Sequence, residues 1–170
     1  MSKNPMRNVE IEKVVLNISV GSEREKLDSA VGLLERITDR KPVKTKTNKR
    51  IPSWGVRPGL AIGSKVTLRG KKAKELLNRL LQAKDNEITE KSINDRGCFS
   101  FGINEYIDIP GVKYDPNIGI LGLQVSVNLK RPGYRIKERR IGKRKVPKKH
   151  LVNKEDAIDF LKEEFDVKVI

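Results

Sequence analysis

Two segments of this sequence concentrate cationic side chains with almost no carboxylates between them. Twelve Lys and Arg and no Asp or Glu lie in 40–74, and eleven Lys and Arg with one acid, Glu138, lie in 130–149. These segments hold net charges of +12 and +10 in a chain of net charge +15, so the remainder is mildly acidic. A solvated surface intersperses the two signs. The segregation predicts contact with a polyanion, whose phosphates release counterions when Lys and Arg neutralise them. A basic surface without a partner and a membrane surface are the alternatives.

Polar residues alternate with apolar ones in three segments, 9–20, 62–69 and 121–129, a pattern typical of strands covered on one face. The polar positions should share the uncovered face of an antiparallel sheet. They are Asn17, Ser19, Lys65, Thr67, Arg69, Gln124, Ser126 and Asn128. This mixture of hydrogen-bonding groups and cations suits phosphate, sugar and base-edge contacts of RNA. An ordinary hydrated face is the alternative, and the acid-free segment around Lys65 favours RNA.

The segment 48–63 is a loop by composition, with two prolines and three glycines in sixteen residues. Its candidate contact residues are Lys49, Arg50, Trp54 and Arg57. An exposed tryptophan beside cations can stack on a base or ribose. The alternative is a tryptophan that folds back as a local plug. Long loops in compact domains are usually functional or disordered, so we predict that this one protrudes from the body.

The segment 130–149 is basic and lacks a pattern that would form a core. Such a segment resembles the extensions of ribosomal proteins that order along RNA. A nuclear or generic polyanion-binding tag is the alternative. The predicted contact residues are Arg131, Arg135, Arg139, Arg140, Lys143 and Arg144.

Catalysis and metal binding have little support in the sequence. Cys98 is the only cysteine and His150 the only histidine, so the chain has neither an internal disulfide nor a Cys/His metal cage. Cys98 is predicted to lie in the core. The glycines of 55–63 lack the Gly-Lys-Ser/Thr ending of a phosphate-binding loop. Asp108, Asp115 and Asn117 could ligate a metal, but in a Pro/Gly-rich region they are typical turn formers. We predict no catalytic residue, metal site or cofactor.

No segment approaches the roughly 18 apolar residues that a spanning helix needs. The polar start of the chain, Met1 to Asn8, is not followed by the apolar stretch of a signal peptide. With a single cysteine, this predicts a soluble intracellular protein in a reducing compartment.

The helices and strands predicted from the rest of the sequence would position these candidate sites. Apolar residues at helical spacing predict helices over 27–37, 71–84 and 153–165, the last begun by Asn153. Strands are predicted over 9–20, 43–47, 62–69, 98–107 and 121–129. Strands and helices do not alternate regularly, which favours an α+β fold: a mainly antiparallel four- to five-stranded sheet with helices packed on one face. We predict one domain over 1–170, with a protruding loop at 48–63 and a basic extension plus terminal helix at 131–170.

Three blocks of sequence carry a resemblance to a known family. They are MRNVEIEKVVLNISVG, DRKPVKTKTNKRIPSWGVRPGLAIGSKVTLRGKKA and FSFGINEYIDIPGVKYDPNIGILGLQVSVNLKRPGYR. In this order, and over nearly the whole chain, they resemble the universal large-subunit ribosomal protein that binds 5S rRNA, the L-five family. The basic extension with its closing helix looks like the archaeal and eukaryotic branch.

The resemblance implies a non-enzymatic protein of the cytoplasmic large ribosomal subunit. Positions that match family contacts with 5S rRNA are Asn17, Arg40, Thr67 and Arg69, and Arg40 departs from the Gln usual in bacterial relatives. The IPSWGVRPG loop would face P-site tRNA, and 107–119 would belong to a bridge to a small-subunit protein. Large-subunit rRNA and neighbouring ribosomal proteins are the other implied partners. A different RNA chaperone or tRNA-binding module, and an enzyme acting on nucleic acid, are the competing hypotheses.

Overall fold

A computed structural model describes residues 4–170; the first three residues of the polar segment 1–8 lie outside the described part. A five-stranded antiparallel sheet is the centre of the fold, with the strand order β2-β3-β1-β6-β5. Its strands are β1 (Glu10–Ser19), β2 (Val43–Lys46), β3 (Ala61–Leu68), β5 (Phe99–Ile103) and β6 (Leu123–Lys130). Two short strands, β4 (Glu87–Ile88) and β7 (Lys168–Val169), pair in parallel beside it.

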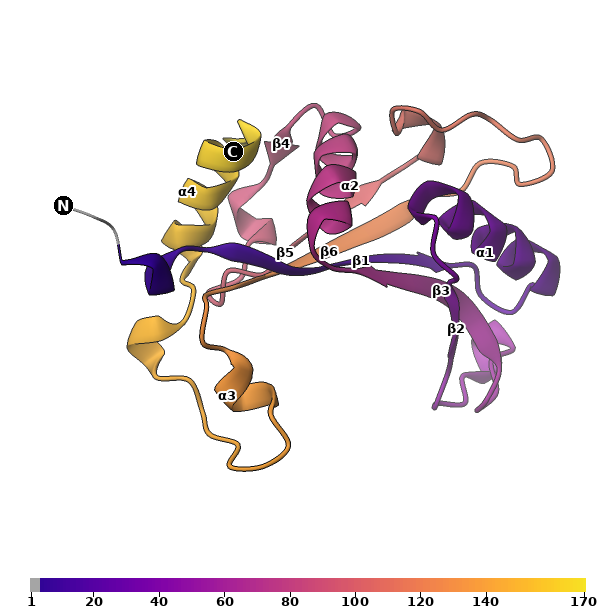
Figure 1. Ribbon diagram of the computed structural model, residues 1–170. Helices are drawn as coiled ribbons and strands as arrows, with labels where there is room; N and C mark the ends of the chain where they lie inside the picture. Colours follow the sequence, from indigo (N-terminus) through magenta and orange to yellow (C-terminus); the bar gives the residue numbers. More distant parts are fainter. Residues whose placement is uncertain (1–3) are drawn as a thin grey trace.

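Three of the helices cover one face of the sheet. They are α1 (Arg24–Thr38), α2 (Lys71–Gln82) and α4 (Lys154–Phe165), and in Figure 1 they lie together on the upper side. The short α3 (Arg135–Glu138) lies on the opposite side of the sheet. The predicted α+β fold with helices on one face is therefore confirmed.

The core forms between the helices and the inward positions of the strands, as the alternation predicts. On β1 the buried residues are Val14, Leu16 and Ile18. The helix predicted over 71–84 is α2, and its apolar stripe is buried: Ala73, Leu76, Leu77, Leu80 and Leu81. Asn153 begins α4, where its backbone N–H donates to the Asp156 carboxylate at 2.9 Å.

Several predicted boundaries were wrong. The strand predicted over 98–107 ends at Ile103, because a 3-10 turn at Tyr106–Asp108 follows and buries the Tyr106 side chain completely. The strand predicted from Leu121 begins at Leu123, and β3 begins at Ala61, inside the predicted loop. Cys98, predicted to be in the core, is only half-buried.

Candidate nucleic-acid interface

The uncovered face of the sheet brings polar residues from three strands into adjacent positions. Asn17 on the central strand β1 pairs with Lys65 of β3 on one side and Gln124 of β6 on the other. Val15 of β1 pairs in the same way with Thr67 and Ser126. Because directly paired residues of antiparallel strands point to the same face, the predicted side chains form two neighbouring rows across the sheet.

These polar side chains are not used within the protein. Among the described residues 4–170, the only side-chain hydrogen bond from the predicted face residues is a long one, 3.5 Å from the Ser19 hydroxyl to the Ile62 carbonyl. Lys65, Thr67 and Gln124 are exposed, whereas Asn17 and Ser126 are half-buried between neighbouring side chains. The face therefore offers hydrogen-bond donors and acceptors at fixed spacing to an external ligand.

Arg69 and Arg40 lie at the margins of this face. Arg69 is exposed directly after β3 and continues the alternation of Lys65 and Thr67. Arg40 is exposed on the connection between α1 and β2, outside the five strands, where its carbonyl accepts a weak bond from Thr38. The two paired rows and Arg69 thus form one surface, and Arg40 lies beyond its β2 edge.

A hairpin borders the open face at one end. Beyond the ends of β2 and β3, the pairing of the two arms continues through backbone hydrogen bonds. They run from Thr47 N to Leu60 O (2.9 Å) and from Gly59 N to Thr47 O (2.8 Å). The tip closes where Ile51 and Val56 exchange two backbone hydrogen bonds, around a 3-10 turn at Pro52–Trp54. Trp54 is 71% exposed. The alternative of a tryptophan that folds back as a plug is therefore wrong. The Trp54 ring is available for stacking.

The basic extension borders the face at the other end. In Figure 1 the hairpin and the extension around α3 both lie on the side of the sheet away from α1, α2 and α4. Of the predicted extension contacts, Arg135, Arg139, Arg140, Lys143 and Arg144 are exposed. The open face is thus a polar surface that lies between two cationic projections, the hairpin and the extension.

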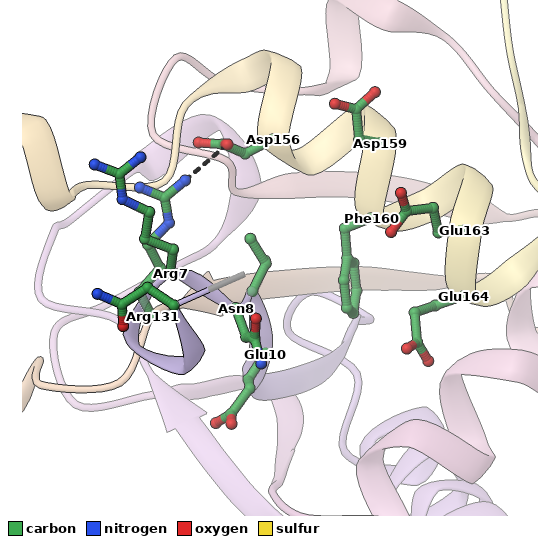
Figure 2. A pocket seen from close by; sticks show the side chains of 11 residues that line it. Arg7, Asn8, Glu10, Arg131, Asp156, Asp159, Phe160, Glu163 and Glu164 are labelled. Carbon is green, nitrogen blue, oxygen red and sulfur yellow. Dashed lines mark ion pairs between the residues drawn. The ribbon is translucent and has the colours of Figure 1, made fainter. Parts of the chain in front are cut away.

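Arg131 differs from the other extension residues because it is only 9% exposed. Its guanidinium pairs with Asp156 of α4 at 2.7 Å and donates to the Leu151 carbonyl at 3.4 Å. Figure 2 shows this ion pair as a dashed line. Arg131 therefore attaches the extension to α4.

One groove on the helix-covered side is rich in carboxylates, although Arg7 and Arg131 also line it. Figure 2 shows a groove between the start of β1 and α4, where Asp159, Glu163 and Glu164 line one wall around Phe160. Carboxylates repel phosphate, so the wall that α4 contributes to this groove is unsuited to RNA. Asp159, Glu163 and Glu164 all lie on α4, so the helix itself brings them together, and the docking of α4 beside residues 4–10 forms the groove.

Titratable groups within residues 4–170 give no sign of a catalytic centre. The pKa of Asp115 is lowered, first by the hydrogen bond from Arg36, and that of Glu90 is lowered by Lys154. Both are surface ion pairs. Asp115 also accepts from the Asn117 backbone at 3.0 Å, so it forms the predicted turn. Within the described residues, no group of three or more His, Cys, Asp or Glu could hold a metal ion, and no helix is long and apolar enough to cross a membrane.

An antiparallel sheet with one face covered by helices and the other left polar between basic projections defines an open-faced α+β protein suited to a polyanionic ligand. Sequence comparison identifies the family. The family described as Ribosomal protein L5 matches residues 4–57, and the ribosomal L5P family C-terminus matches residues 61–163. The chain belongs to the ribosomal protein L5 family. This is a family of ribosomal structural proteins, which confirms the prediction that the chain is not an enzyme.

Archaeal proteins are among the similar relatives. The chain is 54% identical over 169 residues to the large ribosomal subunit protein uL5 of Nanoarchaeum equitans, covering 99% of both chains. It is 48% identical to the protein of the same name from Sulfurisphaera tokodaii, over 98% of this chain and 95% of that protein. The Archaeoglobus fulgidus uL5 is 49% identical over 94% of this chain and 89% of its own length.

Proposed function

We propose that this chain is a structural component of the large ribosomal subunit and that its open sheet face binds 5S rRNA. The observation that carries the proposal is the pair of rows across the sheet, Lys65–Asn17–Gln124 and Thr67–Val15–Ser126, whose polar side chains make no hydrogen bonds within residues 4–170. Asn17, Lys65, Thr67 and Arg69 provide the contacts, and Arg40 extends them past the β2 edge. Polar groups at fixed positions recognise the shape of an RNA, while Lys and Arg neutralise its phosphates.

The two projections contact other RNA in this proposal. Lys49, Arg50, Trp54 and Arg57 on the exposed hairpin tip face P-site tRNA, where the tryptophan stacks and the cations bind phosphate. The exposed cations of the extension bind large-subunit rRNA. The connection between β5 and β6 bridges to a small-subunit protein, which its exposed apolar residues Tyr114 and Ile120 support.

Binding to 5S rRNA, to tRNA and to an unrelated RNA of equal length across a salt series tests the proposal. We expect 5S rRNA to bind at least tenfold more tightly, about 1.4 kcal/mol. The double change Thr67→Ala plus Arg69→Ala should remove that preference at high salt. A matched control is Thr89→Ala plus Arg96→Ala, two exposed residues off the open face that lose the same groups and the same charge.

The outcomes separate specific from generic binding. Loss of the preference in the Thr67/Arg69 variant but not in the control supports the open face as the site. Equal binding of all three RNAs with one steep salt slope would refute it, because counterion release is independent of sequence. A preference for tRNA over 5S rRNA would instead favour a tRNA-binding module.

A further inference from the structure

The basic extension exposes one large aliphatic side chain. Ile141 is 85% exposed, the largest value among the exposed large hydrophobic residues of the described chain. The other aliphatic residues of the extension behave differently, since Ile136 and Val146 are half-buried. An isoleucine in water forgoes the stabilisation that burial of its side chain would give. Electrostatic attraction alone does not require an aliphatic residue here.

Backbone and side-chain hydrogen bonds close the loop that presents Ile141. The Arg139 Nε donates to the Gly142 carbonyl at 2.8 Å, and the Arg144 backbone N–H donates to the Ile136 carbonyl at 3.0 Å. Gly142 has φ of +62°, a left-handed conformation that glycine adopts without strain. The turn therefore places Ile141 at its outer end instead of folding it towards α3.

The surroundings of Ile141 select the chemistry of its partner. Arg140 precedes it in the sequence and Lys143 follows two residues later, and the segment 139–149 contains no carboxylate. Within residues 4–170, none of the cations in 139–149 forms an ion pair. The partner must combine negative charge with an apolar surface. An RNA nucleotide whose base is unstacked does so, because a base or ribose face lies beside its phosphate.

We propose that Ile141 packs against an unstacked base or exposed ribose of ribosomal RNA, while the adjacent Arg140 and Lys143 bind the flanking phosphates. This inference rests on the proposed function, since it assumes a chain incorporated in the large subunit. It adds an apolar contact to a segment whose sequence predicts only electrostatic ones. Phosphate contacts position a protein on RNA without reading the nucleotide, so the apolar contact would restrict the extension to a site with an unstacked nucleotide.

Photo-crosslinking in reconstituted large subunits tests which class of molecule covers Ile141. A diazirine-bearing amino acid replaces Ile141 in the full chain, and a matched variant carries it at Ile120, which is 63% exposed but lies outside the basic segments. We expect position 141 to cross-link to rRNA, at a nucleotide that is unpaired or next to a bulge. Cross-links only to protein, to RNA equally at both positions, or to nothing would overturn the proposal.

Binding of labelled protein to large subunits that lack it, across a salt series, measures the apolar part of the contact. Ile141→Ser should weaken binding about tenfold at every salt concentration, about 1.4 kcal/mol, without changing the salt slope. Ile141→Leu should bind within about twofold of the original chain, because most of the apolar area is kept. Arg140→Gln should instead reduce the slope by roughly 0.7 to 0.9, the value of one phosphate contact.

Two further outcomes separate this inference from the function on which it rests. If Ile141→Ser binds like the original chain while the Thr67/Arg69 variant loses affinity, the apolar contact is refuted and the proposed function stands. If Ile141→Ser reduces the salt slope as Arg140→Gln does, the change acts through the phosphate contacts and the proposal is also refuted. Failure of the proposed function would give a different result, namely equal binding of unrelated RNAs by the free protein.

Discussion

The two basic projections that border the open face have similar composition but are attached to the body in different ways. The hairpin between β2 and β3 is held by main-chain hydrogen bonds that continue the sheet. At its root, Gly63 packs so tightly that an added Cβ would lie 2.6 Å from the Ile18 carbonyl oxygen. The hairpin is thus an extension of the sheet itself.

The extension around α3 is held by side chains. Tyr134 is 5% exposed, and its hydroxyl accepts from the Val152 backbone N–H at 3.0 Å. The Tyr134 and His150 rings meet edge to face with centroids 6.0 Å apart. Beside them, Arg131 pairs with Asp156. Between these contacts, residues 139–147 have no regular secondary structure.

The difference shows that the charge density of a segment does not predict how the segment is ordered. Backbone hydrogen bonds connect the two arms of the hairpin from its root to the Ile51–Val56 pair at its tip. Side-chain anchors attach the ends of the extension to the body, and between them only local hydrogen bonds, such as those from Arg139 to Gly142 and from Arg144 to Ile136, order the chain. Substitutions at the two roots should therefore have effects of different size and kind.

The largest effect should come from Tyr134→Ala at the root of the extension. The change removes a buried ring and leaves the buried Val152 backbone N–H without its partner. We expect a loss of about 3 kcal/mol in the free energy of unfolding, within the range for large aromatic truncations. Urea denaturation followed by circular dichroism measures it.

Trp54→Ala is the matched test in the hairpin. The Trp54 ring is exposed, so its loss should change the free energy of unfolding by no more than about 0.5 kcal/mol. If this change cost as much as Tyr134→Ala, the hairpin too would depend on side-chain anchors, and the contrast between the two projections would be lost.

A somewhat smaller effect is expected from Gly63→Ala at the root of the hairpin. The new methyl group would meet the Ile18 carbonyl oxygen at 2.6 Å and the Ser19 Cα at 3.2 Å. Both are backbone atoms of β1, so relief requires the strands to separate. We expect a loss of about 2 kcal/mol in the free energy of unfolding, typical of overpacking.

Gly102→Ala on β5 provides the control for that substitution. Gly102 also lies on the open face, opposite Gln124, but an added Cβ there would meet no atom within 4 Å. Its free energy of unfolding should change by no more than about 0.5 kcal/mol. Equal destabilisation by both substitutions would show that loss of glycine in a strand, and not the close approach at the hairpin root, is responsible.

Periodic features could be predicted from the sequence, and these included the site. The alternation in β1, β3 and β6 predicts Asn17, Lys65 and Thr67 on one face, as the strand pairing confirms. The helices predicted over 27–37 and 71–84 correspond to α1 and α2. In α1 the buried residues include both Leu33 and Leu34, so the helix buries a wider face than a narrow apolar stripe.

Features that depend on single long-range contacts could not be predicted. Tyr134 has no periodic partner nearby in the sequence, and its burial depends on a main-chain group of Val152, eighteen residues later. The pairing of β7 with β4 joins chain segments about eighty residues apart, each only two residues long. Such short strands carry too few residues to show an alternation.

The connection between β5 and β6 extends the comparison to a loop that is not basic, and it should show the smallest effect. Arg36 of α1 donates to the Asp115 carboxylate at 2.5 Å, and the Tyr106 hydroxyl accepts from the Asp115 backbone N–H at 3.0 Å. This loop is therefore anchored by side chains, as the extension is. The Arg36 hydrogen bond lowers the pKa of Asp115 below its usual value of 3.8.

A lowered carboxyl pKa fixes the sign of the pH dependence. The contribution of Asp115 to stability is complete above the pKa of the unfolded chain and is lost as the pH falls through the lower pKa of the folded protein. Asp115→Asn should therefore destabilise the protein slightly at neutral pH, and its difference from the original chain should shrink as the pH drops below about 4. Urea denaturation at a series of pH values measures this difference.

Asp95→Asn is the control for the pH series, because Asp95 is exposed and forms no ion pair within residues 4–170. It should leave the free energy of unfolding unchanged at every pH. A difference between Asp115→Asn and the original chain that stays constant down to acid pH would mean that the charge of Asp115 does not hold the loop. The Asn117 backbone N–H would still donate to the side chain of residue 115, so the loop would remain anchored by a side chain but without dependence on its charge.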